Sequence, residues 1–398
     1  MYLLTNPSMD YAWGSPTAIP KLMGLSPGSG SRPVAEVWIG AHPAAPSTLE
    51  LGGRALGLDS YIEAHPVHAL GYAAQGGDVS TLPFMMKLLA AERPLSLQVH
   101  PTRAGAEEGF HREEAAGLSI HDPARCYRDR SHKPEMLYAL GSFELLAGFR
   151  RPDEVREIID GLDVPGLAPV LAALDNSDSE TALRAGFATA LDTDPRLAAC
   201  LVDNVVGQAR RLRYDRPEYR LLTRLADAHP GDLGIVAAMF LNHRMLTQGE
   251  AVFIPAGVVH SYVSGLGVEV MATSDNVLRA GLTPKHISIP EVMRTVTFTD
   301  RYPDIVVPVR SGRRCVFAPP TPEFALWVNE SSDERAGEWM AGPASGPRLV
   351  VSCGSPVDLD CGGRRLVLES GRSAFVPDAD GPLEVRTAGT VAIACHPR

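Results

Sequence analysis

The sequence contains very little lysine and has no excess of positive charge. Its 37 basic residues comprise 33 arginines and only four lysines, against 47 acidic residues, which gives a net charge of −10. An acidic chain without basic runs is a poor candidate for binding nucleic acid or an anionic membrane through bulk charge. Because arginine serves almost every other cationic position, the lysines are candidates for tasks that need a compact ammonium or a tunable amine. They are Lys21, Lys87, Lys133 and Lys285.

Paired cysteines, an apolar leader and long apolar runs are also missing. The six cysteines are scattered without a CxxC pair, which argues against a disulfide framework. The longest uncharged stretch, residues 251–268, contains Pro255, His260 and three glycines, a mixture that a membrane span would not tolerate. No apolar core precedes Lys21, the first basic residue, so we expect no secretory signal. These absences predict a cytoplasmic protein with no membrane partner.

Hydrophobic patterning divides the 398 residues into β-rich and helical stretches. Residues 1–151 and 241–310 show short apolar runs broken by glycine and proline, which is typical of strands and turns. Residues 152–240 differ, because their apolar residues recur at the spacing of one helical face, beginning with Val155, Ile158, Ile159 and Leu162. We therefore predict a discontinuous β domain over 1–151 and 241–310, with a helical domain inserted at 152–240.

A weak internal repeat predicts two related β domains. Residues 249–255 (GEAVFIP) reappear as residues 371–377 (GRSAFVP), with glycine, aromatic and proline in register. A turn glycine followed by a strand that ends in proline recurs in double-sheet barrels of the jelly-roll or cupin type. Five residues beyond the proline the first copy has His260, whereas the second has Pro382. We expect two cupin-like barrels, with residues 311–398 forming a C-terminal domain without a metal site.

Four polar side chains in strand-like or proline-rigid settings form a candidate metal site. Gln98 and His100 project from the same face of a strand, Glu135 follows a proline, and His260 follows the strand closed by Pro255. Nitrogen and oxygen donors without thiolate suit Zn²⁺ or another divalent transition metal. The alternative is that each histidine is a hydrogen-bonded core residue and the glutamate a surface acid. Four such residues together favour the metal.

Cationic residues downstream suggest an anion site. Residues 269–285 bring Asp275, Asn276, Arg279 and Lys285 close together in the sequence. A polar turn with a salt bridge is one interpretation, and a phosphate site beside the metal is the other, since arginine and lysine are the natural partners of a phosphate. Lys87 lies alone in an apolar run. Its side chain either extends from a barrel edge to solvent or is buried for a purpose, that is, for a function in the site. We favour a purpose.

Several long motifs resemble one enzyme family, the type I phosphomannose isomerases. They lie at residues 35–43, 83–87, 98–101, 127–135 (YRDRSHKPE) and 269–285. The resemblance implies a cupin catalytic domain, a helical insertion, a second cupin-like domain and a cytoplasmic enzyme of carbohydrate metabolism that interconverts mannose 6-phosphate and fructose 6-phosphate. It also implies one zinc ion and its ligands Gln98, His100, Glu135 and His260. Arg279 is the implied active-site residue. Val259 stands where the family often has proline.

The implied reaction assigns roles to the remaining candidates. An aldose–ketose isomerisation moves a proton between C1 and C2 through an enediol, so it needs an acid/base group and a clamp on the phosphate. Lys133 is our candidate for proton transfer, because a nearby dication disfavours its ammonium form. His132 would assist ring opening and Asp275 would orient Arg279 or a hydroxyl. The candidate substrate contacts are Lys87 and Lys285 at the phosphate, with Trp13, Tyr262 and Glu269 lining the pocket.

Two rival functions remain open from the sequence. A cupin oxygenase could use Fe²⁺ with two histidines and one carboxylate, and O₂ consumption would identify it. A non-catalytic sugar-binding protein would keep the fold, but it predicts a damaged site, whereas every metal and acid/base position is filled. We expect a monomer, with a dimer left open, and the breadth of sugar substrates is not predicted.

Overall fold

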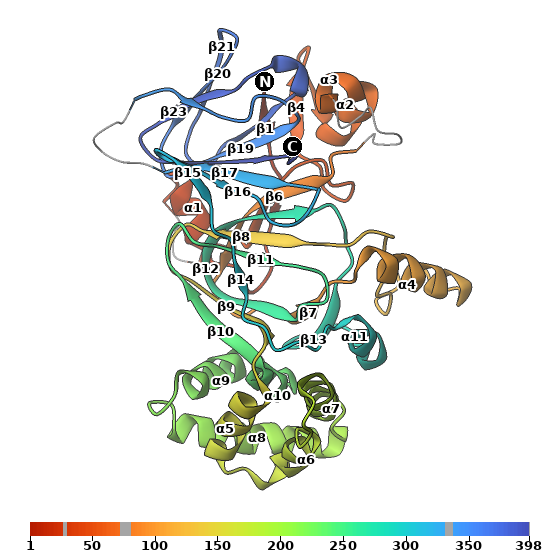
Figure 1. The fold of residues 1–398 in the computed structure, drawn as a ribbon. Coiled ribbons are helices and arrows are strands. Elements are labelled where there is room, and N and C mark those ends of the chain that lie inside the picture. The colour runs from red at the N-terminus through yellow and green to blue at the C-terminus, as the bar shows by residue number, and fades with distance from the viewer. Residues whose placement is uncertain (27–29, 72–80, 331–336, 398) are drawn as a thin grey trace.

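A computed structural model describes residues 1–26, 30–71, 81–330 and 337–397 of the chain. These residues are mainly β, with most of the helices gathered at one end of the molecule (Figure 1). None of the described helices is long and apolar enough to cross a membrane.

The candidate site lies in an antiparallel sheet of eleven strands. Its central strand is β12 (His260–Ala272), which pairs with β6, β7, β8 and β9. All eight residues of β6 are buried. On one face Met86 and Leu88 pack in a core shared with the C-terminal strands, and on the other Leu89 packs in a second cluster. The other strands are β2 (Ser8–Met9), β3 (Glu36–Ile39), β6 (Phe84–Ala91), β7 (Leu97–Val99), β8 (Glu135–Ala139), β9 (Phe143–Phe149), β10 (Leu241–Leu246), β11 (Ala251–Ile254), β13 (Leu278–Gly281) and β14 (Asp304–Ile305).

The C-terminal strands form a nine-stranded and a four-stranded sheet. The larger contains β1 (Tyr2–Thr5), β4 (Thr48–Leu51), β5 (Arg54–Gly57), β15 (Val309–Ser311), β16 (Arg314–Phe317), β17 (Ala325–Asn329), β19 (Arg348–Cys353), β22 (Ser373–Val376) and β24 (Thr390–Cys395). The smaller contains β18 (Met340–Ala341), β20 (Val357–Cys361), β21 (Arg364–Leu368) and β23 (Glu384–Thr387). In the strand pairing of the described residues neither large sheet closes on itself, so the two predicted barrels are not seen as closed barrels.

The N-terminal strands differ from the predicted division of the chain. We assigned residues 1–151 wholly to the first domain, but β1 pairs with β22 on one side and with β4 on the other. Leu4 of β1 is buried in the same core as Phe375 and Leu349 of the C-terminal strands. An alternating pattern predicts a strand but not its partner, which explains the difference. The internal repeat does mark equivalent local structure, since β11 and β22 each follow a glycine of positive φ, Gly249 and Gly371.

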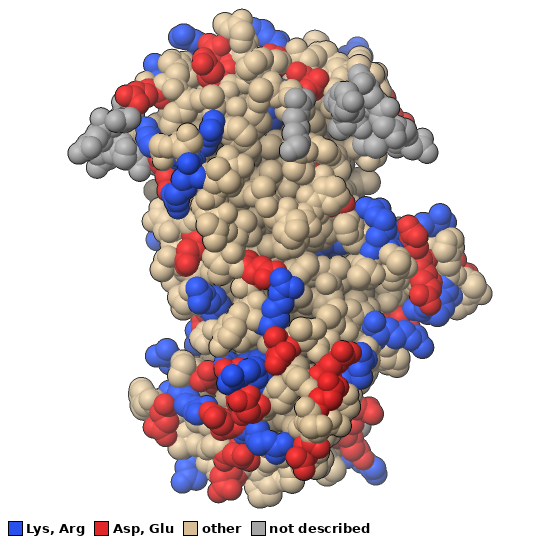
Figure 2. All heavy atoms as spheres, viewed as in Figure 1, with Lys and Arg blue, Asp and Glu red and all other residues tan. Residues whose placement is uncertain are grey.

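The stretch predicted to be helical is helical. Its first helix begins at Pro152, and the four apolar residues that predicted it are buried. Their core also contains Leu97 and Val99 of β7 and Leu278 of β13, so the helices pack beneath the strands that carry Gln98 and Arg279. Figure 2 shows charges of both signs interspersed over this end. The helices are α5 (Pro152–Leu162), α6 (Ala168–Ala173), α7 (Ser179–Leu191), α8 (Pro195–Arg211), α9 (Pro217–Ala228) and α10 (Gly234–Ala237).

The remaining α-helices are short or peripheral. Of these, α4 projects from the side of the molecule in Figure 1. They are α1 (Ala18–Leu22), α2 (Leu58–Ala64), α3 (Pro66–Leu70), α4 (Arg103–Ala115) and α11 (Ile289–Thr295).

Candidate active site

Three of the four predicted metal ligands meet in the interior of the protein. His100 follows β7, Glu135 begins β8 and His260 begins β12, and all three are buried. One ligand atom from each lies within 4.8 Å of the others. The Nε2 atom of His100 is 3.3 Å from one carboxylate oxygen of Glu135, and the Nε2 atom of His260 is 3.2 Å from the other.

Backbone carbonyls fix which nitrogen of each imidazole faces this centre. Nδ1 of His100 lies 2.7 Å from the carbonyl oxygen of Asn276, and Nδ1 of His260 lies 3.0 Å from that of Val258. A carbonyl only accepts, so each Nδ1 carries the hydrogen and each Nε2 of a neutral ring presents a lone pair. Burial is the main cause that lowers the pKa of His100, to about 4, which keeps its ring neutral at pH 7.

The donor set fits a divalent cation. Burial works against the ionised form of Glu135, but the ammonium of Lys133 favours it, and the pKa of this carboxyl lies well below the usual range. Two lone pairs and a carboxylate therefore point at one another. Nε2 of His100 and Oε2 of Glu135 have no hydrogen-bond partner among the described residues. Buried polar atoms without partners are costly, and a cation between them would remove that cost.

Gln98 lies beside this centre. The residues that flank it in β7, Leu97 and Val99, are fully buried on the other face, as the strand alternation predicts. Gln98 pairs with His260 of β12 on one side and with Arg279 of β13 on the other. Its amide nitrogen is 3.3 Å from Nε2 of His260, and half a turn of the amide presents the oxygen instead. This register brings a candidate fourth ligand and the candidate arginine to one face.

Three cations lie together near this face. Arg279 and Lys285 come from β13 and the loop after it, and Arg128 from the loop before β8. The pKa of Lys285 is lowered, first by partial burial and then by repulsion from Arg279 and Arg128. Within the ranges that the structure describes, no carboxylate lies within ion-pair distance of these three groups, which leaves them available to an anion.

The loop that carries Lys285 is held by the helical segment. Leu282 has a positive φ of 55°, a conformation that branched apolar residues rarely adopt. Asp232 from the helical segment accepts hydrogen bonds from the backbone nitrogens of Leu282 and Thr283, both at 2.9 Å. These bonds compensate the strained backbone and fix the loop relative to β13.

Lys87, predicted to bind the phosphate, and Asp275, predicted to orient Arg279 or a hydroxyl, each contact other charged side chains. Lys87 is buried, with its ammonium 3.1 Å from Glu269 and 3.5 Å from Glu36, so a phosphate would have to compete with two carboxylates. Asp275 faces His42 at 3.4 Å rather than Arg279, and its backbone nitrogen donates to Asp129. Both residues belong to the acidic and basic network around the centre.

The other predicted residues line the same region. The ammonium of Lys133 is 3.2 Å from Glu135, and His132 faces a glutamate of the C-terminal segment. Tyr262 is buried two residues after His260 on β12, and its hydroxyl has no hydrogen-bond partner in the described structure. Trp13 packs in the apolar cluster that contains Tyr262.

Comparison with known proteins identifies the family. Residues 1–152 match the model of the phosphomannose isomerase type I catalytic domain. The chain is 33% identical to mannose-6-phosphate isomerase of Escherichia coli (strain K12) over 395 residues, which cover 98% of each protein. The chain belongs to the type I phosphomannose isomerase family. The resemblance found in the sequence motifs is thereby confirmed.

Relatives extend across kingdoms and include solved structures. The mannose-6-phosphate isomerase of Mus musculus is 29% identical, with 97% of this chain and 92% of the mouse protein covered. A crystal structure of a phosphomannose isomerase mutant from Salmonella typhimurium superposes with a TM-score of 0.90 at 30% identity, and covers all of both chains. A mannose 6-phosphate isomerase bound with zinc and yttrium superposes over the same extent with a TM-score of 0.89.

Two residues of this family member are important in the geometry but were not assigned roles from the sequence. Asn276 is fully buried, and its side chain bonds the backbone of Arg128, Asp129 and Ser131 while its carbonyl orients His100. Arg128 lies in the YRDRSHKPE motif, but its local sequence does not distinguish it from the 32 other arginines. Their positions among the quoted motifs were the only available signal.

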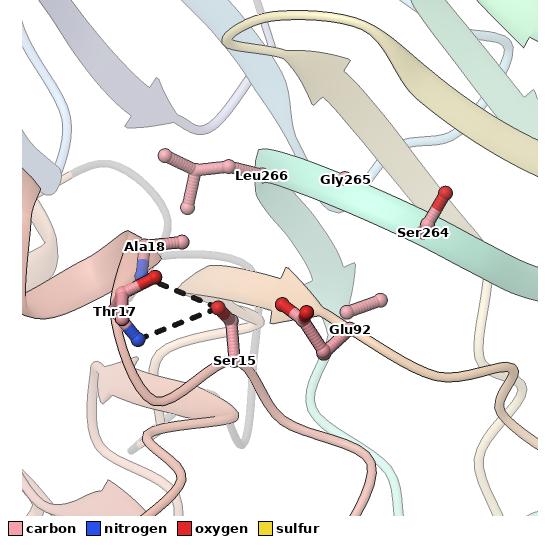
Figure 3. A pocket seen from close by; sticks show the side chains of 8 residues that line it. Ser15, Thr17, Ala18, Glu92, Ser264, Gly265 and Leu266 are labelled. Atoms are coloured by element: carbon pink, nitrogen blue, oxygen red, sulfur yellow. Dashed lines mark hydrogen bonds between the residues drawn. The ribbon is translucent and has the colours of Figure 1, made fainter. Parts of the chain in front are cut away.

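A separate pocket of about 370 Å³ lies elsewhere on the same strands (Figure 3). Ala91 and Gly265, which line it, pair four positions along the β6–β12 ladder from Lys87 and Glu269. At about 3.3 Å per residue that separation is roughly 13 Å. No residue predicted for the active site lines this pocket, so we do not include it in the candidate site.

Proposed function

We propose that this chain is a zinc-dependent isomerase that interconverts mannose 6-phosphate and fructose 6-phosphate. The observation that carries the proposal is the buried arrangement of His100, Glu135 and His260, with lone pairs converging and hydrogens turned away. The names of the full-length relatives and the zinc-bound structures support the same reaction and metal.

The metal would be held by Gln98, His100, Glu135 and His260. When bound, Zn²⁺ would polarise the oxygens on C1 and C2 of the open-chain sugar as a Lewis acid. The hydrogen bonds to the carbonyls of Asn276 and Val258 keep both rings in the tautomer that a metal requires.

The phosphate would be bound by the three unpaired cations. Lys285, Arg279 and Arg128 repel one another, and a dianion among them would convert that repulsion into attraction. We assign Lys87 instead to the carboxylates of Glu36 and Glu269, which it neutralises. Arg279 also pairs with Gln98 across the ladder, which supports a position for it between the metal and the phosphate.

Proton transfer is assigned to Lys133. As the free amine, its Nζ would take the proton from C2 of the aldose while O1 gains a proton, which gives the enediol. The carried proton would then go to C1 as the O2 hydroxyl loses its proton and the C2=O2 double bond forms. The contact of Lys133 with Glu135 places this amine at the metal side of the site. His132 is assigned to ring opening.

The wider predictions remain part of this proposal. We infer a catalytic cupin unit at 1–151 and 241–310, a helical unit at 152–240 and a cupin-like unit at 311–398. Three strands of the first range, β1, β4 and β5, pair within the sheet of the last unit. A cytoplasmic monomer is expected.

A coupled assay with mannose 6-phosphate tests the proposal. The protein should turn over this substrate, lose activity after removal of metal with a chelator, and regain it with Zn²⁺. Lys285→Met should raise KM for the phosphorylated sugar, whereas Lys21→Met, an exposed lysine on α1, should not. Absence of turnover with restored zinc, or metal-dependent O₂ consumption, would refute the isomerase assignment.

A further inference from the structure

One acidic side chain of the C-terminal segment reaches the candidate active site. Glu323 lies in the connection between β16 and β17 and is only 8% exposed. Its Oε1 atom is 2.5 Å from Nε2 of His132 and 3.3 Å from a guanidinium nitrogen of Arg103. Its Oε2 atom accepts a hydrogen bond from the hydroxyl of Thr321. Both oxygens of this carboxylate therefore already have donors.

These contacts determine which nitrogen of His132 carries hydrogen. Burial works against ionisation of Glu323, but the hydrogen bonds from His132 and Thr321 lower its pKa to about 2. An ionised carboxylate can only accept, so His132 donates through Nε2–H. In the neutral ring Nδ1 then has a lone pair, and the structure gives Nδ1 no hydrogen-bond partner within the described residues. The ring is half-buried and does not belong to the fully buried core.

We propose that Glu323 is a positioning residue that fixes the orientation and tautomer of His132, so that Nδ1 is the nitrogen that exchanges protons with the substrate. The inference rests on the proposed isomerase function. During ring opening Nδ1 takes the proton of the O1 hydroxyl, and the C1–O5 bond breaks as the C1=O1 double bond forms. The imidazolium then returns the proton to O5. The C-terminal segment thus supplies one partner of a catalytic histidine.

Steady-state kinetics with single and double variants test this role. E323A should lower kcat at least tenfold while KM for mannose 6-phosphate changes less than threefold, because Glu323 does not touch the substrate. In the H132A background the same substitution should have no further effect, since it acts only through His132. E323Q retains an oxygen that accepts from Nε2–H, so its loss should lie between wild type and E323A.

A matched control lies in the same segment. Glu330 also bonds across to the site-bearing sheet, accepting from the hydroxyl of Tyr138 on β8. E330Q should keep the wild-type kcat. If E323A had a wild-type kcat, or if the losses of E323A and H132A multiplied in the double variant, the positioning role would be refuted.

Nitrogen chemical shifts of the histidine rings give a readout independent of turnover. With ¹⁵N-histidine labelling, the signals that H132A removes should show a protonated Nε2 and an unprotonated Nδ1. E323Q should preserve this pattern, and E323A should average it between tautomers. A protonated Nδ1 in the wild type would overturn the inference even in an active enzyme.

If the wild type showed no isomerase activity, the proposed function would fail, but these shifts would still test the tautomer. If E323A did not fold, E323Q and the wild-type shifts would decide.

Discussion

Replacement of Lys87 by methionine separates an electrostatic role from a phosphate-binding role. Lys87 on β6 lies between Glu269 of β12 and Glu36 of β3, and all three residues are buried. The two carboxylates raise the pKa of Lys87 even though burial opposes its charged form. Removing the ammonium leaves both buried carboxylates without their ion-pair partner. Breaking a buried ion pair by removing one partner costs about 3–5 kcal/mol.

We therefore expect Lys87→Met to lower the free energy of unfolding in urea by about 3–5 kcal/mol at pH 7. Lys21→Met, at an exposed lysine, should change it by less than about 0.5 kcal/mol. Adding Glu269→Gln to Lys87→Met should restore part of the loss, because one of the unpaired charges disappears. Glu36 would still accept from the Trp38 indole at 2.6 Å. A Lys87→Met protein as stable as Lys21→Met, with only a raised KM, would refute this reasoning and restore Lys87 to the phosphate.

Four further predictions follow from the site and its supports. Removal of metal should lower Tm as well as abolish activity, because a ligand that binds only the folded state stabilises it, and calorimetry with and without Zn²⁺ measures the shift. Arg128→Gln should raise KM for mannose 6-phosphate about tenfold, from one lost charged hydrogen bond, with little change in kcat. Gly281→Ala should lower Tm, because its Cβ would lie 2.4 Å from the Cα of Gly234. Burial opposes the ionisation of Glu144, but hydrogen bonds from His243 and Arg224 lower its pKa to about 2 from 4.5. The stability that Glu144 contributes is thus present above pH 4.5 and lost as the pH falls toward 2, so urea curves of wild type and Glu144→Gln should converge at low pH.

The parts of the site that the sequence predicted are those set by local geometry. Alternation along a strand placed Gln98 and His100 on one face, and the structure keeps Leu97 and Val99 buried on the other. Helical periodicity identified the helix that begins at Pro152. Both patterns depend only on backbone repeat, which a short window of sequence contains.

Contacts between segments far apart in the sequence could not be predicted from local sequence patterns. Glu323 is 191 positions from His132, and its own neighbourhood is a proline-rich loop that gave no sign of a site. For Lys87 the sequence indicated only an unusual location, and its partners come from two other strands. The β1 strand joins the C-terminal sheet, although nothing in residues 2–5 distinguishes that sheet from its neighbour. Tertiary contact selected each of these partners.

The register of β12 connects these separate pieces. His260 at its start pairs with Gln98, and Glu269 further along pairs with Lys87, so one strand places both the candidate metal centre and the charged network. A shift of one residue would turn both side chains to the opposite face. The apolar residues of β12 alternate too irregularly near Gly265 and Gly267 to exclude such a shift by themselves. The register is fixed instead by the strands on either side, and these are supported by the helical core at one end and the C-terminal core at the other. The geometry of the site is therefore a property of the whole chain, which explains why the family resemblance extends over all of it.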